Sequence, residues 1–169
     1  FDRMDSHDEA MLMFVDIDDF KTINDTYGHT VGDFWIREVA SQLRHIYRQD
    51  DIICRYGGEF IALIRNTASE QVLETTLGMF FQQLARTSEQ HGQDVHCSVG
   101  VCRIAAADGA SLGTGRTDGD AIGSVDFDQC VAQADLALYE TKRFNKGTFT
   151  VYNYDRSQPA PANIRALNE

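Results

Sequence analysis

The chain has 169 residues, of which 43% are hydrophobic and 24% charged, the size and balance of a single globular domain and not of a disordered chain. Its 15 Lys and Arg against 26 Asp and Glu give a net charge of −11, which disfavours binding to a nucleic acid polymer because the phosphate backbone is repelled. A small phosphorylated ligand is compatible with this charge if metal ions lie between its phosphates and the protein carboxylates.

The first half of the chain predicts a strand and two helices. Residues 10–15 are continuously apolar and indicate a buried central strand, which ends in Asp16-Ile17-Asp18-Asp19. A helical pattern follows from Phe20 to Tyr27, and Gly28 is a typical helix stop. A second helix is expected over residues 32–47, where apolar residues recur at helical spacing.

The remainder predicts a hairpin, two further helices and two further strands. Two short apolar runs flank Gly57-Gly58-Glu59, and glycine supplies the positive φ that a tight hairpin turn needs. Residues 106–123 are rich in Gly, Asp, Ser and Thr and indicate a long loop, and residues 155–169 indicate a polar tail or linker. The expected elements are strands over 52–56 and 60–64, a helix over 69–86, a strand over 95–104, a helix over 127–144 and a strand over 148–153.

This alternation of strands and helices predicts an α/β sandwich of the α+β kind with a mixed sheet, formed by one domain over residues 1–154. No apolar run approaches the ~20 residues that cross a bilayer, and the polar, acidic residues 1–9 do not resemble a signal peptide. The four cysteines, at positions 54, 97, 102 and 130, are scattered without a Cys-x-x-Cys pair. We therefore expect a reduced, cytoplasmic setting and no membrane contact by this segment.

Asp16 and Asp18 stand where a buried strand meets a helix. Carboxylates there can hold Mg²⁺, which prefers oxygen ligands and often shares them with substrate phosphates. The following helix start presents backbone N–H groups to an anion. The alternative is that Asp18 or Asp19 only caps the helix.

Three blocks in this order give a more specific signal than any one of them. The first is Asp16-Ile17-Asp18-Asp19-Phe20-Lys21-Thr22-Ile23-Asn24-Asp25-Thr26-Tyr27-Gly28-His29-Thr30-Val31-Gly32-Asp33, the second is Arg55-Tyr56-Gly57-Gly58-Glu59-Phe60, and the third is Ser98-Val99-Gly100-Val101 followed by residues 134–142. Together they resemble the signature of the GGDEF domains, the bacterial diguanylate cyclases, over residues 10–153.

The resemblance implies a signalling enzyme with a mostly antiparallel sheet like that of the nucleotidyl cyclase and polymerase palm. Two GTP molecules are joined into cyclic di-GMP with release of pyrophosphate, each protomer of a homodimer holding one GTP. The metal is Mg²⁺, with Mn²⁺ as an alternative. Members of the family are usually fused to sensor or membrane segments.

Carried over by position, the resemblance assigns three kinds of residue. Asp16, the Ile17 carbonyl and Glu59 would hold metal, and Glu59 would also help to deprotonate the attacking hydroxyl. Asn24 and Asp33 would bind guanine, because a carboxylate accepts from its N1–H and N2 amine together; for Asp33 the alternative is helix capping after Gly32. The remaining substrate contacts would come from Phe20, Lys21, Gly57, Gly58, Lys142 and Lys146, the last of which stands where an arginine is usual.

The resemblance also implies a site for the product. Arg48 and Asp51 form an Arg-x-x-Asp pattern just before the hairpin, which matches the inhibitory cyclic di-GMP site of the family. Arg48 would bind guanine and phosphate, and Asp51 would hold the edge of the base.

The hairpin motif departs from that of the family, which has five residues where this chain has the four of Gly57-Gly58-Glu59-Phe60. Either a second Glu is deleted, or Phe60 replaces it, which would flip the alternation of the following strand. This favours a second hypothesis, a degenerate domain that binds cyclic di-GMP or GTP without turnover. A phosphatase of the haloacid dehalogenase type, which also has Asp-x-Asp after a strand, ranks far behind because Phe20 stands where its Thr is expected.

Overall fold

The computed structural model describes residues 9–67, 69–105, 125–155 and 157. The predicted loop over 106–123 and most of the predicted tail over 155–169 lie outside the described residues. The elements are β1 (Ala10–Ile17), α1 (Phe20–Tyr27), α2 (His29–Ile46), β2 (Ile52–Tyr56), β3 (Glu59–Arg65), α3 (Glu70–His91), β4 (Cys97–Ile104), α4 (Phe127–Phe144) and β5 (Phe149–Asn153).

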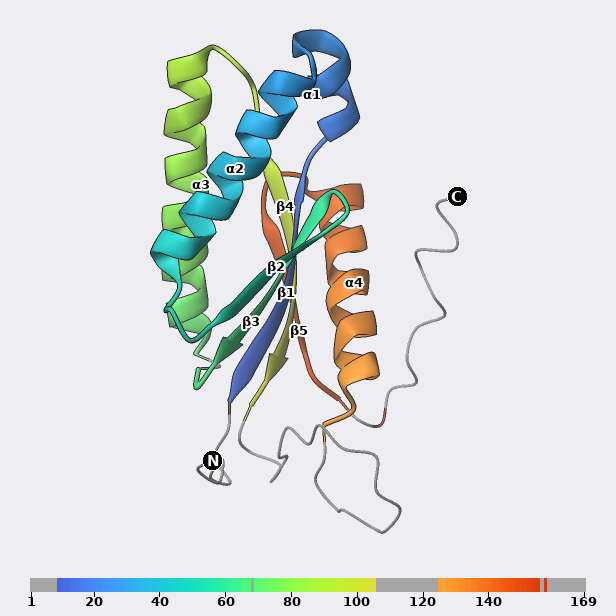
Figure 1. Ribbon diagram of the computed structural model, residues 1–169. Coiled ribbons are helices and arrows are strands. Elements are labelled where there is room, and N and C mark those ends of the chain that lie inside the picture. The colour runs from blue at the N-terminus through green and yellow to red at the C-terminus, as the bar shows by residue number, and fades with distance from the viewer. Residues whose placement is uncertain (1–8, 68, 106–124, 156, 158–169) are drawn as a thin grey trace.

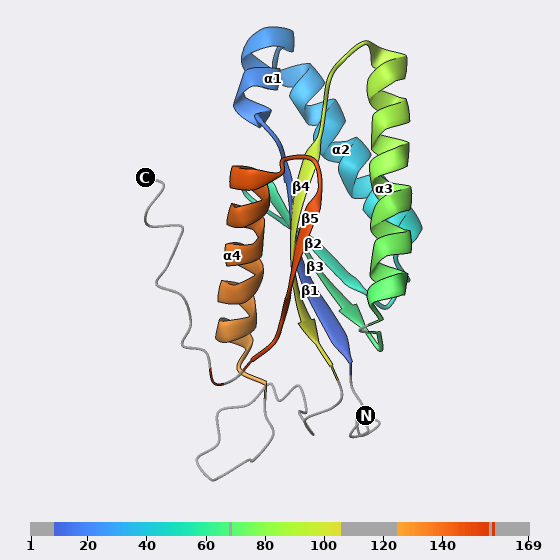
Figure 2. The ribbon, with the colours of Figure 1, turned by 180° about the vertical axis from the view of Figure 1, so that it is seen from behind.

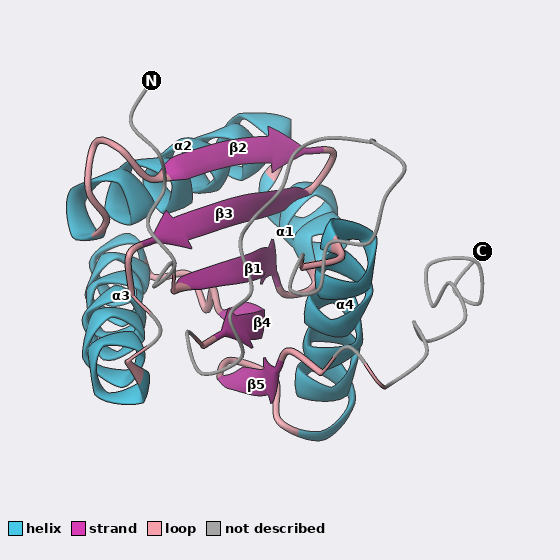
Figure 3. Cartoon of the chain, turned by 90° about the horizontal axis from the view of Figure 1, so that it is seen from below, coloured by secondary structure: helices cyan, strands magenta, loops and turns pink. Residues whose placement is uncertain are grey.

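The strands form a five-stranded sheet in the order β2-β3-β1-β4-β5 (Figure 3). β1 pairs antiparallel with β3 and β4, β2 pairs antiparallel with β3, and β4 pairs parallel with β5 across the α4 connection. The predicted α+β fold with a mixed, mostly antiparallel sheet is therefore confirmed. The Gly57-Gly58 hairpin is part of this sheet and contributes its β2 edge.

Helices cover the two faces unequally, with α2 and α3 on one face and α4 on the other (Figures 1 and 2). Alternation along β1 explains this arrangement, since successive side chains point to opposite faces. Met11, Met13 and Val15 join the core under α2 and α3, whereas Leu12 and Phe14 join the core under α4. β1 is buried on both faces, as its continuous apolar run predicts.

Two helices differ in extent from their predicted ranges. α2 begins at His29, three residues before the predicted start, because Gly28 with a φ of 89° serves as the boundary of both α1 and α2. α3 continues to His91 and ends at Gly92, which adopts the left-handed conformation with a φ of 62°.

Gly100 in β4 allows α4 to lie directly on the sheet. A Cβ built at this position would stand 2.2 Å from the Leu138 nitrogen and 2.3 Å from the Ala134 oxygen. Glycine is therefore required here by the close approach of two backbones. The contact fixes the height of α4 above β4 one helical turn before Lys142.

Candidate functional site

The predicted metal carboxylates lie opposite each other across two neighbouring strands. The register of β1 and β3 pairs Asp16 with Glu59, so their Cβ atoms lie on the same face of the sheet about 5 Å apart. Asp16 follows Phe14 by two residues, which places both carboxylates on the α4 face. The interpretation that these two acidic residues converge agrees with this register.

The hairpin that presents Glu59 has a two-residue turn. Tyr56 pairs with Glu59, and Gly57 between them has a φ of 61°, the positive value that hairpin turns of this length need at their first central position. Arg55 Nε donates to the Gly57 carbonyl at 2.8 Å and braces the turn. The short motif therefore still aims Glu59 at the face that carries Asp16.

The residues that follow the turn keep a regular alternation. Phe60, Ala62 and Ile64 are buried under α2 and α3, and Ile61 and Leu63 pack against the other core. Asp16 and Glu59 lie on the same face as Ile61 and Leu63, at the end of the sheet that carries the hairpin turn.

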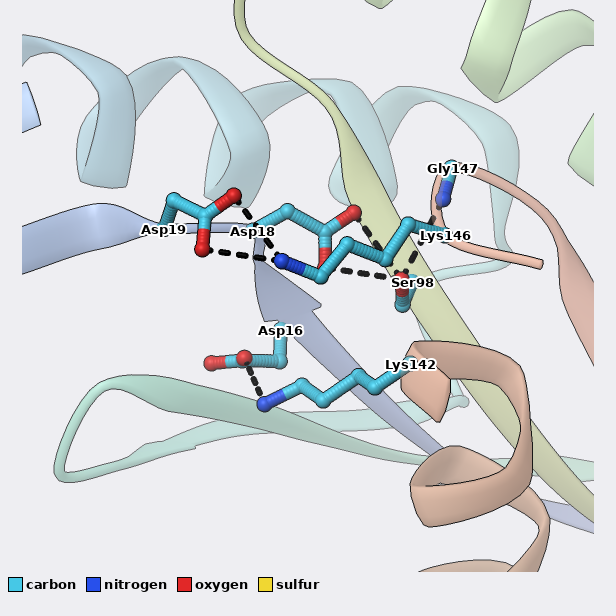
Figure 4. A network of polar contacts seen from close by, with 7 residues as sticks. All are labelled: Asp16, Asp18, Asp19, Ser98, Lys142, Lys146 and Gly147. Atoms are coloured by element: carbon cyan, nitrogen blue, oxygen red, sulfur yellow. Dashed lines mark hydrogen bonds and ion pairs between the residues drawn. The ribbon is translucent and has the colours of Figure 1, made fainter. Parts of the chain in front are cut away.

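Lys142 of α4 reaches the Asp16 carboxylate. Its Nζ forms an ion pair with Asp16 Oδ2 (Figure 4). Burial raises the pKa of the Asp16 carboxyl, the hydrogen bond and charge of Lys142 oppose that rise, and the charges of Asp18 and Asp19 add to it. Asp16 is thus a half-buried carboxylate that is stabilised by a cation.

The neighbouring carboxylates have other partners, and neither caps α1. Asp18 is 8% exposed and accepts from Ser98 Oγ at 2.7 and 2.9 Å, while Gly147 N–H donates to the same Oγ at 3.2 Å. Asp19 is the residue before α1, but its side chain makes no capping hydrogen bond and instead accepts from Lys146 Nζ at 2.9 Å. This hydrogen bond raises the pKa of the Lys146 amine.

The predicted guanine ligands come from α1 and the first turns of α2. A Cβ at Gly32 would meet Asn24 Oδ1 at 1.9 Å and Phe20 Cζ at 3.2 Å, so both side chains pack against this glycine. Asp33 follows directly and is exposed. Because α2 begins at His29, Asp33 lies inside the helix, and the capping alternative for it is wrong. Lys21 is exposed on α1.

The predicted product site lies at the other end of β2, which is about 17 Å long. Asp51 is 5% exposed, and its carboxylate accepts from the backbone amides of Arg48 at 2.8 Å and Arg65 at 3.0 Å. Asp51 therefore anchors the turn before β2 to the end of β3. The Arg48 residue itself is exposed.

The donor set is suited to a hard cation that shares its ligands with phosphates. Among the described residues, no three His, Cys, Asp or Glu side chains form a group that could hold a metal. Asp16 and Glu59, with the Ile17 carbonyl at the end of β1, supply only part of a coordination shell. Mg²⁺ typically takes one or two carboxylates and completes its shell with waters and substrate phosphates, so these residues fit it.

Sequence reasoning gave no role to Ser98 and Gly100, although both lie in the third motif block. The available signal was a small polar residue and a glycine two positions apart in a buried strand. Such a pair places a hydroxyl group and a site where another backbone can approach closely on the same face of the strand.

Comparisons with known proteins agree with this geometry. A protein-family model described as the diguanylate cyclase GGDEF domain matches residues 2–148. Diguanylate cyclase A of Treponema denticola is 30% identical over 146 residues, which are 83% of this chain and 34% of that protein. Diguanylate cyclase DgcP of Escherichia coli is 32% identical over 141 residues, 83% of this chain and 37% of that protein. The chain spans about a third of the length of these relatives.

Solved structures show the same fold. The active GGEEF domain of a diguanylate cyclase from Vibrio cholerae superposes with a TM-score of 0.65 at 23% identity, over 87% of this chain and 85% of that one. The GGDEF domain of DgcB from Caulobacter crescentus, solved in complex with c-di-GMP, gives a TM-score of 0.61 at 26% identity over 85% and 78%. Within the described part of the chain, no helix is both long and apolar enough to span a membrane.

Proposed function

The chain belongs to the GGDEF domain family of diguanylate cyclases, and on that premise we propose that it condenses two GTP molecules into cyclic di-GMP with release of pyrophosphate. The observation that carries the proposal is the pairing of Asp16 with Glu59 beside Lys142. Two carboxylates and an amine on one face match the charges of a metal-bound triphosphate. The shortened hairpin retains this arrangement.

Asp16, Glu59 and the Ile17 carbonyl would hold Mg²⁺, which when bound neutralises phosphate charge and polarises the reacting phosphoryl group. Lys142, Lys146 and Lys21 would bind phosphate oxygens, and the exposed turn Gly57-Gly58 lets the nucleotide approach the backbone.

In each of the two condensations, the 3′-oxygen of one GTP forms a bond to the α-phosphorus of the other. The bond from that phosphorus to the bridging oxygen breaks, and pyrophosphate leaves. Glu59 would accept the proton of the attacking hydroxyl. Its half-buried position opposite Asp16 keeps it within reach of a nucleotide on the same face.

Asn24 and Asp33 would select guanine. The contact of Asn24 with Gly32 brings the amide next to the turn that carries Asp33. A carboxylate that accepts from both N1–H and the N2 amine would be left without donors by adenine, so ATP should be rejected strongly.

The reaction needs two nucleotides, and in this proposal one chain would hold one of them. We therefore propose that two copies face each other as a homodimer. Arg48, exposed beside the Asp51 turn, would bind the product and inhibit the enzyme from a site separate from Asp16. We also propose a cytoplasmic location, where the GTP that this reaction needs is present.

The test is turnover by the purified chain with Mg²⁺ and GTP, followed by chromatographic separation of the nucleotides over a series of protein concentrations. We expect cyclic di-GMP, formed at a rate per chain that rises with concentration, and no product from Glu59→Gln. Glu74→Gln on the exposed surface of α3 is the control and should match the wild type.

One result would favour the second hypothesis, in which the four-residue motif marks a domain that binds without turnover. Wild-type protein that forms no product but binds cyclic di-GMP in a calorimetric titration would contradict the enzyme. Loss of that binding in Arg48→Ala would assign the receptor role to the predicted product site.

A further inference from the structure

The two lysines assigned to phosphate binding already have carboxylate partners. Lys142 pairs with Asp16, and Lys146 pairs with Asp19 (Figure 4). Asp16 is also the carboxylate assigned to the cation. In the protein alone, Lys142 and Asp16 therefore bind each other. In the proposed complex, Lys142 binds a phosphate and Asp16 binds the cation.

We propose that Lys142 and Asp16 form an exchangeable ion pair, which makes the divalent cation and the triphosphate bind as one unit; this inference rests on the proposed function. A cation that arrives alone must displace the Lys142 amine from Asp16. A triphosphate that arrives alone must draw Lys142 away from Asp16 and leave that carboxylate without a counter-charge. When both arrive together, Asp16 gains the cation and Lys142 gains a phosphate.

The burial of the two pairs differs and predicts which one controls binding. The Asp16 side chain is 14% exposed and that of Lys142 36%, whereas those of Asp19 and Lys146 are 65% and 50% exposed. Removing Lys142 leaves the Asp16 charge without its partner at a position where the side chain is mostly shielded from water. An exposed pair is screened by water and contributes little. The effect should therefore reside in Lys142, with Lys146 as a matched control.

The frame around the lysines does not depend on either amine. Ser98 Oγ joins Asp18 to the Gly147 amide, which ties the end of β1 to β4 and to the turn before β5. The backbone contact of α4 with Gly100 fixes the helix that carries Lys142. Rotation of one long side chain is thus enough to exchange partners, and the strands need not move.

The first experiment measures Mn²⁺ binding to the full chain by electron paramagnetic resonance without nucleotide. We expect Lys142→Met to bind Mn²⁺ roughly tenfold more tightly than the wild type, because Asp16 is freed. Lys146→Met removes the same charge nearby and should change the affinity less than about twofold. Lys142→Met that keeps the wild-type circular dichroism spectrum but binds Mn²⁺ no more tightly would overturn the proposal.

The reciprocal experiment uses guanosine 5′-[α,β-methylene]triphosphate in EDTA, because its methylene bridge blocks pyrophosphate release. Coupling between two ligands acts equally in both directions. Asp16→Asn, which frees Lys142, should bind this nucleotide several-fold more tightly than the wild type. Asp19→Asn removes the same negative charge from the exposed pair, and its affinity for the nucleotide should rise less. Equal gains in the two variants would show general electrostatics instead of exchange and would overturn the proposal.

These measurements separate the inference from the proposed function. Neither experiment needs turnover. If the wild type forms no cyclic di-GMP and Lys142→Met binds Mn²⁺ more tightly than the wild type, the ion pair is supported and the enzyme is contradicted. If the wild type forms cyclic di-GMP but Lys142→Met binds Mn²⁺ with the wild-type affinity, the enzyme is supported and the exchange of partners is overturned.

Discussion

Large apolar side chains separate the helices from the sheet on the α2 and α3 face, whereas at Gly100 on the α4 face the backbone of a helix lies directly against the backbone of a strand. Trp35, Leu77 and Phe80 are fully buried on the first face. On the second face, the contact of α4 with Gly100 lies beside the large side chains of Phe14 and Leu138, and smaller or polar residues are buried on the same helix or strand, which include Ala134, Cys102, Gln133 and Thr141. The first face contains the larger hydrophobic core, and the contact at Gly100 on the second face fixes the distance between α4 and the carboxylates of the sheet.

Phe80→Ala should have the largest effect on stability and the smallest on the site. The substitution leaves a cavity under α3, and we expect the free energy of unfolding to fall by about 4 kcal/mol in urea denaturation. Phe80→Leu keeps most of the volume and should lose much less. The nucleotide affinity of the folded fraction should not change; a large change would contradict the separation of the two faces.

Gly100→Ala should damage both stability and the site. The new Cβ must push the α4 backbone away, and we expect a loss of about 3 kcal/mol together with weaker binding of the metal–nucleotide complex, because Lys142 moves with the helix. Gly78→Ala is the matched control, since its Cβ would meet nothing within 4 Å in the helix α3. That control should be neutral or stabilising by up to about 1 kcal/mol. Unchanged binding in Gly100→Ala would contradict the role given to the contact.

Ser98→Ala should have the smallest effect of the three. The buried Asp18 carboxylate and the Gly147 amide both lose a partner, at a cost of about 2 kcal/mol in unfolding free energy. We also expect weaker binding of the metal–nucleotide complex, because the Gly147 amide next to Lys146 loses its hydrogen bond to β4. Ser41→Ala on the exposed side of α2 is the control and should change neither quantity. Loss of stability with unchanged binding would limit Ser98 to a role in folding.

The strands and helices could be predicted from local patterns. Residues 127–144 form α4 over the predicted range, and Asp126 caps it with bonds to the amides of Asp128 and Gln129. The apolar periodicity predicts an end of α3 at Arg86, whereas the helix continues to His91 and ends at Gly92. The order of the strands depends on pairings between segments that are far apart in the sequence. The periodicity of apolar residues carries no information about these pairings.

The candidate site could be predicted only in part, because its residues come from distant segments. The first two motif blocks predict Asp16 and Glu59 as metal ligands; the register of β1 and β3 places the two residues opposite each other, and their role as ligands stays a proposal. The partners of the lysines could not be derived, because Lys146 and Asp19 are 127 positions apart. The hydrogen bond that Asp51 accepts from the Arg65 amide could not be derived either, because Arg65 lies at the end of another strand; the role of Asp51 in product binding stays a prediction.

The two-residue hairpin turn restricts how this protein can vary at its tip. One added residue would require either a three-residue loop with a bulge or a slip of β3 that carries Glu59 to the opposite side of the sheet. Two added residues would extend the ladder by one rung and keep every side chain on its own side. Tolerated changes of length at this tip should therefore come in pairs, unless a bulge accompanies them.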